Sequence, residues 1–232
     1  FIVISVIIAC AGSGKRMKVE KNKILLEVQG KSILQYTCEK FTSCEKIDEI
    51  ILVVAKHDLT VVEELATKII HNKPYKVVVG GSERQYSINN ALQAVDVKSE
   101  IVLIHDAARP MIKVETINKL IKEVEKSSCA ILGVRVKDTI KIADENKVVS
   151  KTPNRDYLWS IQTPQGFKLD IIKTAYQRAQ QEGFLGTDDA SLVERLNIAV
   201  KVVEGEYTNL KVTTPEDLKI IESLLNDEVY NV

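Results

Sequence analysis

Residues 3–16 of the chain read VISVIIACAGSGKR, and this stretch decides the fold. Its first half, Val3–Ala9, is a run of β-branched and small apolar residues with the length of a β-strand. The second half follows directly and contains two glycines and two cations. A buried strand that passes straight into a glycine-rich loop is typical of α/β proteins, whose ligands bind beyond the carboxyl ends of parallel strands. The stretch therefore predicts a first strand and, after it, a binding loop.

Similar apolar runs alternate with helical patterns along the rest of the 232 residues. Strands are expected at Val3–Ala9, Glu49–Ala55, Tyr75–Val79, Ile101–His105, Ala130–Val136 and Ala199–Val203. Helices are expected at Ser32–Phe41, Leu59–Ile70, Arg84–Val95, Val114–Ser127, Lys168–Glu182, Asp188–Leu196 and Pro215–Leu225. This alternation predicts crossover units and an α/β fold with a Rossmann-like, doubly wound, mostly parallel sheet, in a single domain over 1–232.

One segment, at about 135–159, breaks the alternation. It contains two short β-like pieces, Thr139–Ala143 and Val148–Thr152, on either side of the turn-forming residues 144–146. We expect a protruding β-hairpin arm here. Because a hairpin this thin has no core of its own, it needs another surface to pack against, and a second subunit is one candidate.

The composition excludes several classes of protein. Lys and Arg together number 32, as do Asp and Glu, so the chain lacks the positive field of a nucleic-acid-binding protein. Its four cysteines form no CxxC pair, which argues against a zinc site or a disulfide framework. No apolar stretch approaches the roughly 20 residues that cross a bilayer, and the first residues lack a signal-peptide pattern. We expect a soluble, cytoplasmic protein with no membrane or nucleic-acid partner.

The loop Ala11–Met17 is suited to phosphate. Its glycines free backbone N–H groups to point at an anion, and Lys15 and Arg16 supply charge. It is not a dinucleotide fingerprint, because Met17 stands where GxGxxG requires glycine, and it is not a Walker loop. The alternative is a solvated basic loop.

Two further segments follow expected strands. Asp106 comes directly after an apolar run and could hold Mg²⁺, which needs only one or two carboxylates besides substrate phosphates. Alternatively, Asp106 is a turn residue and Arg109 its salt-bridge partner. In the segment 80–87, Ser87 could hydrogen-bond a base edge, whereas Ser82 could simply cap the next helix.

Six blocks of sequence, taken in order, form one pattern. They are Ala11–Met17, Glu83-Arg84 with Ser87, His105–Pro110, Gln162–Phe167, Thr187–Ser191 and Asn209–Leu218. Together they resemble the 2-C-methyl-D-erythritol 4-phosphate cytidylyltransferases of the non-mevalonate isoprenoid pathway, over nearly the whole chain. The resemblance implies the type A nucleotidyltransferase fold, CTP and methylerythritol phosphate as substrates, Mg²⁺ as cofactor and a homodimer.

The resemblance also implies roles for matching residues. The catalytic cations would be Lys15, Arg16, Lys23 and Lys211. The nucleotide would be bound by Cys10, Ala11, Gly12, Ser13, Gly14, Gly81, Ser82, Arg84, Ser87 and Asp106, of which Asp106 would hold the metal. The methylerythritol phosphate would be bound by Asp106, Arg109, Thr139, Arg155, Thr163, Thr187 and Lys211, with Thr139 and Arg155 reaching into the partner subunit's site.

The sequence departs from the family pattern at three positions. Cys10 stands where alanine is common, Ser82 where aspartate or asparagine is common, and Asn22 where proline usually precedes the lysine. Contacts made through the backbone should survive the first two changes. The third change leaves open how the backbone before Lys23 places this lysine in the site.

Three other functions fit parts of this pattern. A ribitol 5-phosphate cytidylyltransferase shares the glycine loop and the Asn-x-Lys-Val-Thr-Thr-Pro ending, but tends to have valine where this chain has Ala108. A nicotinamide-dependent oxidoreductase could share the sheet, but residues 51–55 end without a ribose-binding carboxylate. A nucleotide-binding regulator without turnover is the third.

Overall fold

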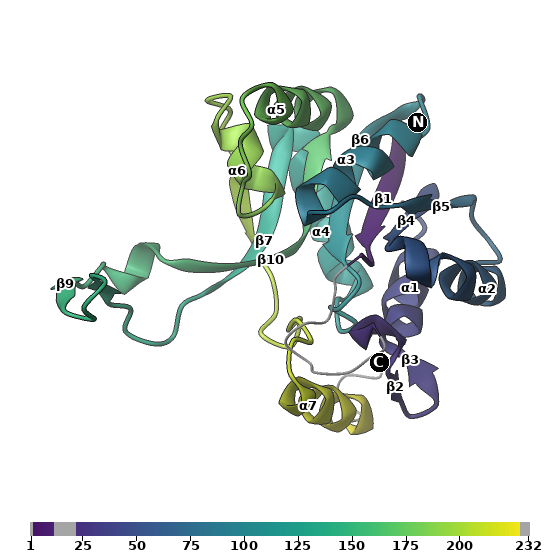
Figure 1. Ribbon diagram of the computed structural model, residues 1–232, viewed down its shortest axis with the longest axis horizontal. Coiled ribbons are helices and arrows are strands. Elements are labelled where there is room, and N and C mark those ends of the chain that lie inside the picture. The colour runs from purple at the N-terminus through teal and green to yellow at the C-terminus, as the bar shows by residue number, and fades with distance from the viewer. Residues whose placement is uncertain (1, 12–21, 228–232) are drawn as a thin grey trace.

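The computed structural model describes residues 2–11 and 22–227, and a seven-stranded sheet forms its centre (Figure 1). The strand order is β11-β7-β10-β6-β1-β4-β5. Their bounds are β1 Val3–Ala9, β4 Glu49–Val54, β5 Tyr75–Val79, β6 Ser99–Asp106, β7 Cys129–Arg135, β10 Trp159–Lys168 and β11 Lys201–Glu204. All neighbours are parallel except β10, which runs antiparallel to both β6 and β7. The predicted doubly wound, mostly parallel sheet is confirmed.

Helices cover both faces of this sheet. They are α1 Ile33–Ser43, α2 Leu59–Ile69, α3 Arg84–Ala94, α4 Val114–Ser127, α5 Leu169–Gln181 and α6 Asp189–Glu194. The last helix, α7 Pro215–Asn226, packs instead beside residues Glu27–Val28 (Figure 1). Successive side chains of β1 alternate between the faces, so that Ile4, Val6 and Ile8 pack with α1, α2 and α4, while Ile7 packs with α3, α5 and α6. No helix in the ranges 2–11 and 22–227 is long and apolar enough to cross a membrane.

The six strands and seven helices expected from periodicity are present within a few residues, and β10 is an addition. Its sequence includes Pro164 and Gly166, which both weaken the strand signal. A Cβ on Gly166 would lie 2.7 Å from Cγ2 of Val124 and 2.8 Å from Cδ2 of Leu103. Glycine is therefore needed for α4 and β6 to pack this closely around β10. A two-residue pairing of β2 (Glu27–Val28) with β3 (Lys31–Ser32) is the other addition.

The predicted arm is a hairpin that leaves the sheet between β7 and β10 and extends away from it (Figure 1). Strands β8 (Ile142–Ala143) and β9 (Val149–Lys151) pair antiparallel, and η3 (Arg155–Tyr157) precedes the return to β10. The turn forms because Asp144 Oδ1 accepts hydrogen bonds from two backbone N–H groups, at 3.0 and 2.9 Å. The arm exposes apolar side chains, namely Ile140, Ile142, Val148, Val149 and Tyr157.

The four cysteines are buried free thiols. Burial raises the pKa of Cys38 to about 12 and also raises the pKa of the Cys10 thiol. A thiol protonated at neutral pH is a poor nucleophile. The cysteines are therefore part of the apolar core.

Candidate active site

The candidate site lies where β1 and β6 end side by side. Ala9 is the register partner of Asp106 in the parallel pair, so the loops that follow both strands start at the same edge of the sheet. The loop after β5 joins them, because the backbone N–H of Gly80 donates to the carbonyl of Val54 at the end of β4. Three of the segments that the sequence analysis singled out thus converge, as expected for a doubly wound sheet.

Asp106 is the centre of a charged cluster. Its Oδ2 accepts a hydrogen bond from Lys211 Nζ at 2.7 Å, and its Oδ1 accepts one from Arg84 Nε at 3.3 Å. Burial by itself would raise the pKa of Asp106, but the charges of Arg84 and Lys211 outweigh it and hold the pKa well below its ordinary range. The carboxylate is therefore ionised at any physiological pH. The alternative in which Arg109 is its salt-bridge partner is wrong, since Arg84 and Lys211 hold that position.

A second aspartate fixes Arg84. Asp189, which is fully buried at the start of α6, accepts two parallel hydrogen bonds from Arg84, at 3.0 and 2.8 Å. Tyr176 on α5 donates a third hydrogen bond to the same carboxylate. Burial alone would lower the pKa of Arg84, but Asp189 and Asp106 outweigh it and raise the pKa. Asp189 lies within one of the six sequence blocks, but the resemblance implies no role for it, and the sequence contains no signal that it would meet Arg84.

Thr163 and His105 lie beneath Asp106. The Thr163 hydroxyl accepts from the backbone N–H of Asp106 at 2.9 Å and lies 3.1 Å from His105 Nδ1. On its other side, His105 Nε2 lies 3.1 Å from the carbonyl oxygen of Arg109. Thr163 is buried, so in this structure its hydroxyl supports the Asp106 loop. Arg109 is half-buried, and its guanidinium donates to the carbonyl of Asn209 at 2.7 Å.

In the segment 80–87, residues 80–83 form a tight loop before α3, and Ser87 lies in the first turn of that helix. The Ser87 hydroxyl is buried, accepts from the backbone N–H of Gly81 at 3.1 Å and donates to the carbonyl of Glu83 at 3.0 Å. Ser82 does not cap α3, because Glu83 is the N-cap residue and no side chain caps the helix. Gly81 and Ser82 are exposed, whereas Ser87 holds the loop in shape.

Residues at the start of the glycine loop are only partly described. The backbone N–H of Cys10 donates to the carbonyl of Val53, and its own carbonyl accepts from Asn22. Ala11 follows it and is half-buried. The residues for which triphosphate contacts are expected lie outside the described ranges: Gly12, Ser13, Gly14, Lys15 and Arg16. Lys23 is described and begins η1 (Lys23–Leu25).

Three of the expected substrate residues are exposed and distant from Asp106 in sequence, whereas Asp106 is buried. Thr139 and Arg155 belong to the exposed arm, where the Arg155 guanidinium donates to the carbonyl of Lys137 at 2.6 Å. Thr187 is exposed in the loop before α6. The single chain therefore brings together Arg84, Asp106 and Lys211, with Thr163 behind them, but not the arm residues.

The donor set fits a magnesium ion only in company with phosphate. Among the described residues, no three His, Cys, Asp or Glu side chains are grouped to hold a metal. Asp106 provides one ionised carboxylate at the mouth of the loops. Mg²⁺ is commonly held by one or two carboxylates, with substrate phosphates and waters completing its shell. A site of this kind would be formed jointly by Asp106 and a bound polyphosphate.

The buried His105 makes stability depend on pH. Burial lowers its pKa from an ordinary value of 6.5 to about 4, whereas in the unfolded chain it protonates normally. The unfolded state then binds more protons between these values, so the free energy of unfolding should fall as pH falls through this window. We expect a loss of about 2 kcal/mol between about pH 7 and about pH 5. Urea unfolding at both pH values measures this change in the free energy of unfolding. In His105→Gln the change should be smaller than in the wild type. An equal change in the variant would mean that other groups cause it.

Comparisons with known proteins agree with this geometry. The family model described as 2-C-methyl-D-erythritol 4-phosphate cytidylyltransferase matches residues 4–227. Proteins of that name from Caldanaerobacter subterraneus subsp. tengcongensis and Bacillus velezensis are 47% and 43% identical to the chain. The alignments cover 96% of this chain and 98% of the first protein, and 97% of this chain and 97% of the second.

Solved structures show the same likeness. The crystal structure of 4-diphosphocytidyl-2C-methyl-D-erythritol synthase from Anaerococcus prevotii superposes with a TM-score of 0.88 at 38% identity, covering 97% of each chain. The crystal structure of 2-C-methyl-D-erythritol 4-phosphate cytidylyltransferase from Thermus thermophilus superposes with a TM-score of 0.78 at 27% identity. This match covers 97% of this chain and 100% of that one.

Proposed function

The chain belongs to the 2-C-methyl-D-erythritol 4-phosphate cytidylyltransferase family, and from this premise we propose how its residues carry the reaction. The enzyme transfers CMP from CTP to 2-C-methyl-D-erythritol 4-phosphate, giving 4-diphosphocytidyl-2-C-methyl-D-erythritol and pyrophosphate. The observation that carries the proposal is the ionised Asp106 between two cations, at the edge of the sheet where such folds bind nucleotides.

The chemistry needs no side-chain base. A phosphate oxygen of the acceptor attacks the α-phosphorus of CTP, and the bond from that phosphorus to the bridging oxygen of the β-phosphate breaks as pyrophosphate leaves. The acceptor is a phosphate monoester whose second pKa is about 6, so it is already a dianion at neutral pH. The protein's task is to align two polyanions and to balance charge that grows on the transferring and leaving groups.

We assign that task to cations. Lys211 is half-exposed beside Asp106 and can turn toward a bound phosphate without leaving the cluster. Lys23 follows the glycine loop, and Lys15 and Arg16 within that loop are assigned to the triphosphate by family pattern. Arg84 is held by two carboxylates, so its part is to orient Asp106.

Asp106 is the residue proposed to hold Mg²⁺. Transfer of a cytidylyl group is a kind of reaction that typically uses a divalent metal, which neutralises negative charge on the phosphates. The carboxylate of Asp106 stays ionised down to low pH, because Arg84 and Lys211 hold its pKa below the ordinary range despite burial. An anionic oxygen is thus available to a metal–phosphate complex wherever the enzyme works.

The cytosine contacts are assigned to the segment 80–87, which comprises the loop before α3 and its first turn, and to the end of β1. Gly81 and Ser82 present exposed backbone, and Ser87 holds that backbone through two hydrogen bonds. The backbone of Ala11 faces the same edge. Because Cys10 donates its only N–H to Val53, any contact from Cys10 to the base is assigned to its carbonyl oxygen, which accepts from Asn22 and has a second lone pair.

The acceptor side is proposed to need two subunits. Thr139 and Arg155 lie on an arm that points away from the chain's own sheet (Figure 1), and that arm exposes several apolar side chains. Exposed apolar groups on a thin hairpin favour a protein partner. We assign this partner to a second copy of the chain, whose site Thr139 and Arg155 complete beside Thr163, Thr187 and Arg109. Sedimentation equilibrium should give twice the chain mass; a monomer that is fully active would overturn this assignment.

One assay tests the function. Purified protein is incubated with Mg²⁺, CTP and either methylerythritol phosphate or ribitol 5-phosphate, and pyrophosphate is measured. We expect release with the first acceptor and at most a trace with the second, and ATP in place of CTP should support little turnover. Equal release with both acceptors would contradict the assigned specificity, and no release with either would contradict the enzyme assignment.

Replacing Arg155 with alanine tests the arm. The lost guanidinium is expected to raise KM for methylerythritol phosphate by about ten- to a hundredfold, the value of a charge-assisted hydrogen bond, with KM for CTP little changed. Lys141→Ala is the matched control, since Lys141 is an exposed cation of the same arm, whose ammonium donates to the Thr152 hydroxyl. If both KM values rise equally in Arg155→Ala, the arm acts only on structure.

A further inference from the structure

Asn22 uses its whole side chain to join three parts of the fold. Its amide nitrogen donates one hydrogen bond to the carbonyl of Cys10 and another to Oδ2 of Asp58, both at 2.9 Å. Its amide oxygen accepts from the backbone N–H of Ile24 at 3.4 Å. Cys10 directly follows β1 and precedes residues 12–21, and Ile24 lies in the 3-10 turn η1 after them. The side chain therefore ties the residues before that segment to the residues after it.

Asp58 supplies the fixed end of this arrangement. It is the last residue of η2 (Lys56–Asp58) and precedes α2, but its carboxylate does not cap that helix. Asp58 and Asn22 are only 7% and 8% exposed. The exposed side chain of His57 lies 3.5 Å from the same carboxylate oxygen. Breaking the hydrogen bond between this buried carboxylate and this buried amide would leave both groups without a partner. Both side chains are therefore held in place.

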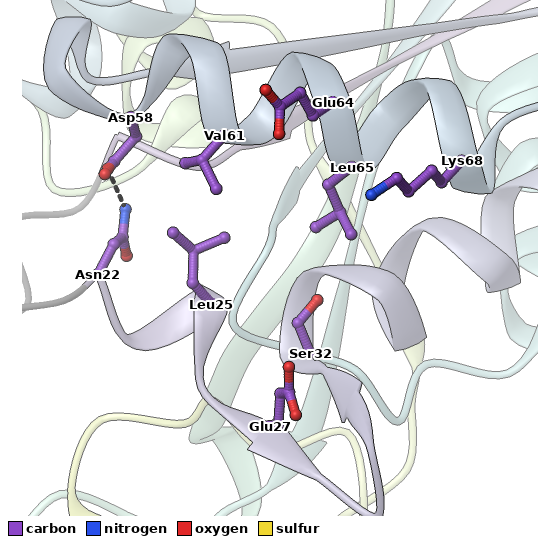
Figure 2. A pocket seen from close by; sticks show the side chains of 9 residues that line it. All are labelled: Asn22, Leu25, Glu27, Ser32, Asp58, Val61, Glu64, Leu65 and Lys68. Carbon is purple, nitrogen blue, oxygen red and sulfur yellow. Dashed lines mark hydrogen bonds between the residues drawn. The ribbon is translucent and has the colours of Figure 1, made fainter.

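A cavity beside the pair shows why the hydrogen bonds of Asn22 matter. It has a volume of about 460 Å³ and separates η1 from α2, with the Asn22–Asp58 hydrogen bond at one end and Lys68 at the other (Figure 2). Between these ends Leu25 faces Val61 and Leu65 across the opening. Ile24 anchors the centre of the turn in the core. The amide–carboxylate pair thus bridges the two walls where the turn begins, which is at Lys23.

We propose that Asn22 and Asp58 are a positioning pair that sets the place of Lys23 relative to the end of β1. The proposal rests on the role assigned above to Lys23, which neutralises charge on the reacting phosphate. The pair has no contact with substrate and acts through the backbone of η1. A misplacement of about 1 Å at a catalytic group lowers the rate by up to about a hundredfold. Loss of the pair should therefore lower kcat rather than weaken substrate binding.

Steady-state kinetics of four variants test the proposal. Asn22→Ala and Asp58→Ala should each lower kcat by about ten- to a hundredfold, with both KM values changed less than about threefold. The double variant should be no slower than the worse single variant, because the two groups act as one unit. Asp58→Asn keeps an oxygen that can accept the hydrogen bond from Asn22, and it should recover most of the rate. Full additivity, or a purely KM effect, would overturn the pairing.

The Lys23→Ala background separates this proposal from the assignment on which it rests. If Lys23 acts as assigned, Lys23→Ala is slow, and adding Asn22→Ala should slow it no further. Normal turnover by Lys23→Ala would refute the role of Lys23. If Lys23→Ala is slow but adding Asn22→Ala lowers kcat by the same factor as in the wild type, the positioning pair is refuted and the role of Lys23 stands.

A matched control guards against general destabilisation. Glu64→Gln alters an exposed residue of α2 that lines the same cavity but does not touch the pair, and its kcat should equal that of the wild type. Thermal unfolding is recorded for every variant. If kcat of Asn22→Ala recovers fully at a temperature well below its Tm, the loss reflects unfolding and the proposal is wrong.

Discussion

Replacing Lys211 with alanine is expected to lower kcat by about a hundred- to a thousandfold, the range found when one preorganised charge partner of a transition state is removed. Lys211 Nζ lies 2.7 Å from Oδ2 of Asp106, and its side chain is 36% exposed, so it faces both the carboxylate and the space above it. Charge on the transferring phosphoryl group grows only as the reaction proceeds. The loss should therefore appear in kcat, measured by pyrophosphate release at saturating substrates.

The control for this variant lies eight residues further along the chain, on α7. Lys219→Ala removes an exposed lysine of α7 and should leave kcat unchanged. Lys211→Arg keeps the charge but changes its shape and length, and we expect it to recover only part of the rate. An Lys211→Ala enzyme with normal kcat and a raised KM would show that Lys211 binds the ground state and the transition state equally.

Removing the charge of Asp189 is expected to have the largest effect on stability. Asp189→Ala leaves Arg84 without its bidentate partner and Tyr176 without an acceptor, in a site where Asp189 is fully buried. Breaking a buried pair costs about 3–5 kcal/mol, and because the Arg84 side chain is 36% exposed we expect about 2–4 kcal/mol. Urea unfolding at neutral pH measures this loss.

The same substitution should also reduce activity, because Arg84 loses the group that aims it at Asp106. Tyr176→Phe deletes one hydrogen bond and keeps the ion pair, so it should cost only about 1 kcal/mol and leave kcat close to normal. Glu194→Ala, at an exposed position of the same helix α6, should change neither quantity. If Asp189→Ala were as stable as Glu194→Ala, the ion pair would contribute nothing net to folding.

The sheet could be predicted from sequence where its strands are apolar runs, but β10 could not. Strands such as β1 are buried on both faces and contain only small or branched residues for most of their length. In β10 the central residues include Gln162, Pro164 and Gly166, which have low strand propensity. This strand is stabilised by its antiparallel neighbours β6 and β7, and such pairing leaves no local signal in its own sequence.

The site was predictable as separate motifs, not as an arrangement. The positions of Asp106 and Lys211 follow from the end of a strand and from the family pattern, but their ion pair does not. Nothing local to Arg84 indicates that its main partner is Asp189. Thr163 illustrates the limit most clearly: the family pattern predicts it beside the substrate, but no local signal indicates that its hydroxyl also accepts a hydrogen bond from the backbone N–H of Asp106.

The ion pairs around Asp106 also bear on how the molecule folds. Arg84 and Asp189 are separated by 105 positions, and so are Asp106 and Lys211. Contacts of such long sequence separation form late, because the chain between them must first be ordered, and they raise the contact order of the whole domain. A nascent chain on the ribosome cannot make the second pair until Lys211, which directly precedes α7, has emerged. Regain of turnover during refolding is therefore a sensitive report on the final docking of the carboxyl-terminal segment.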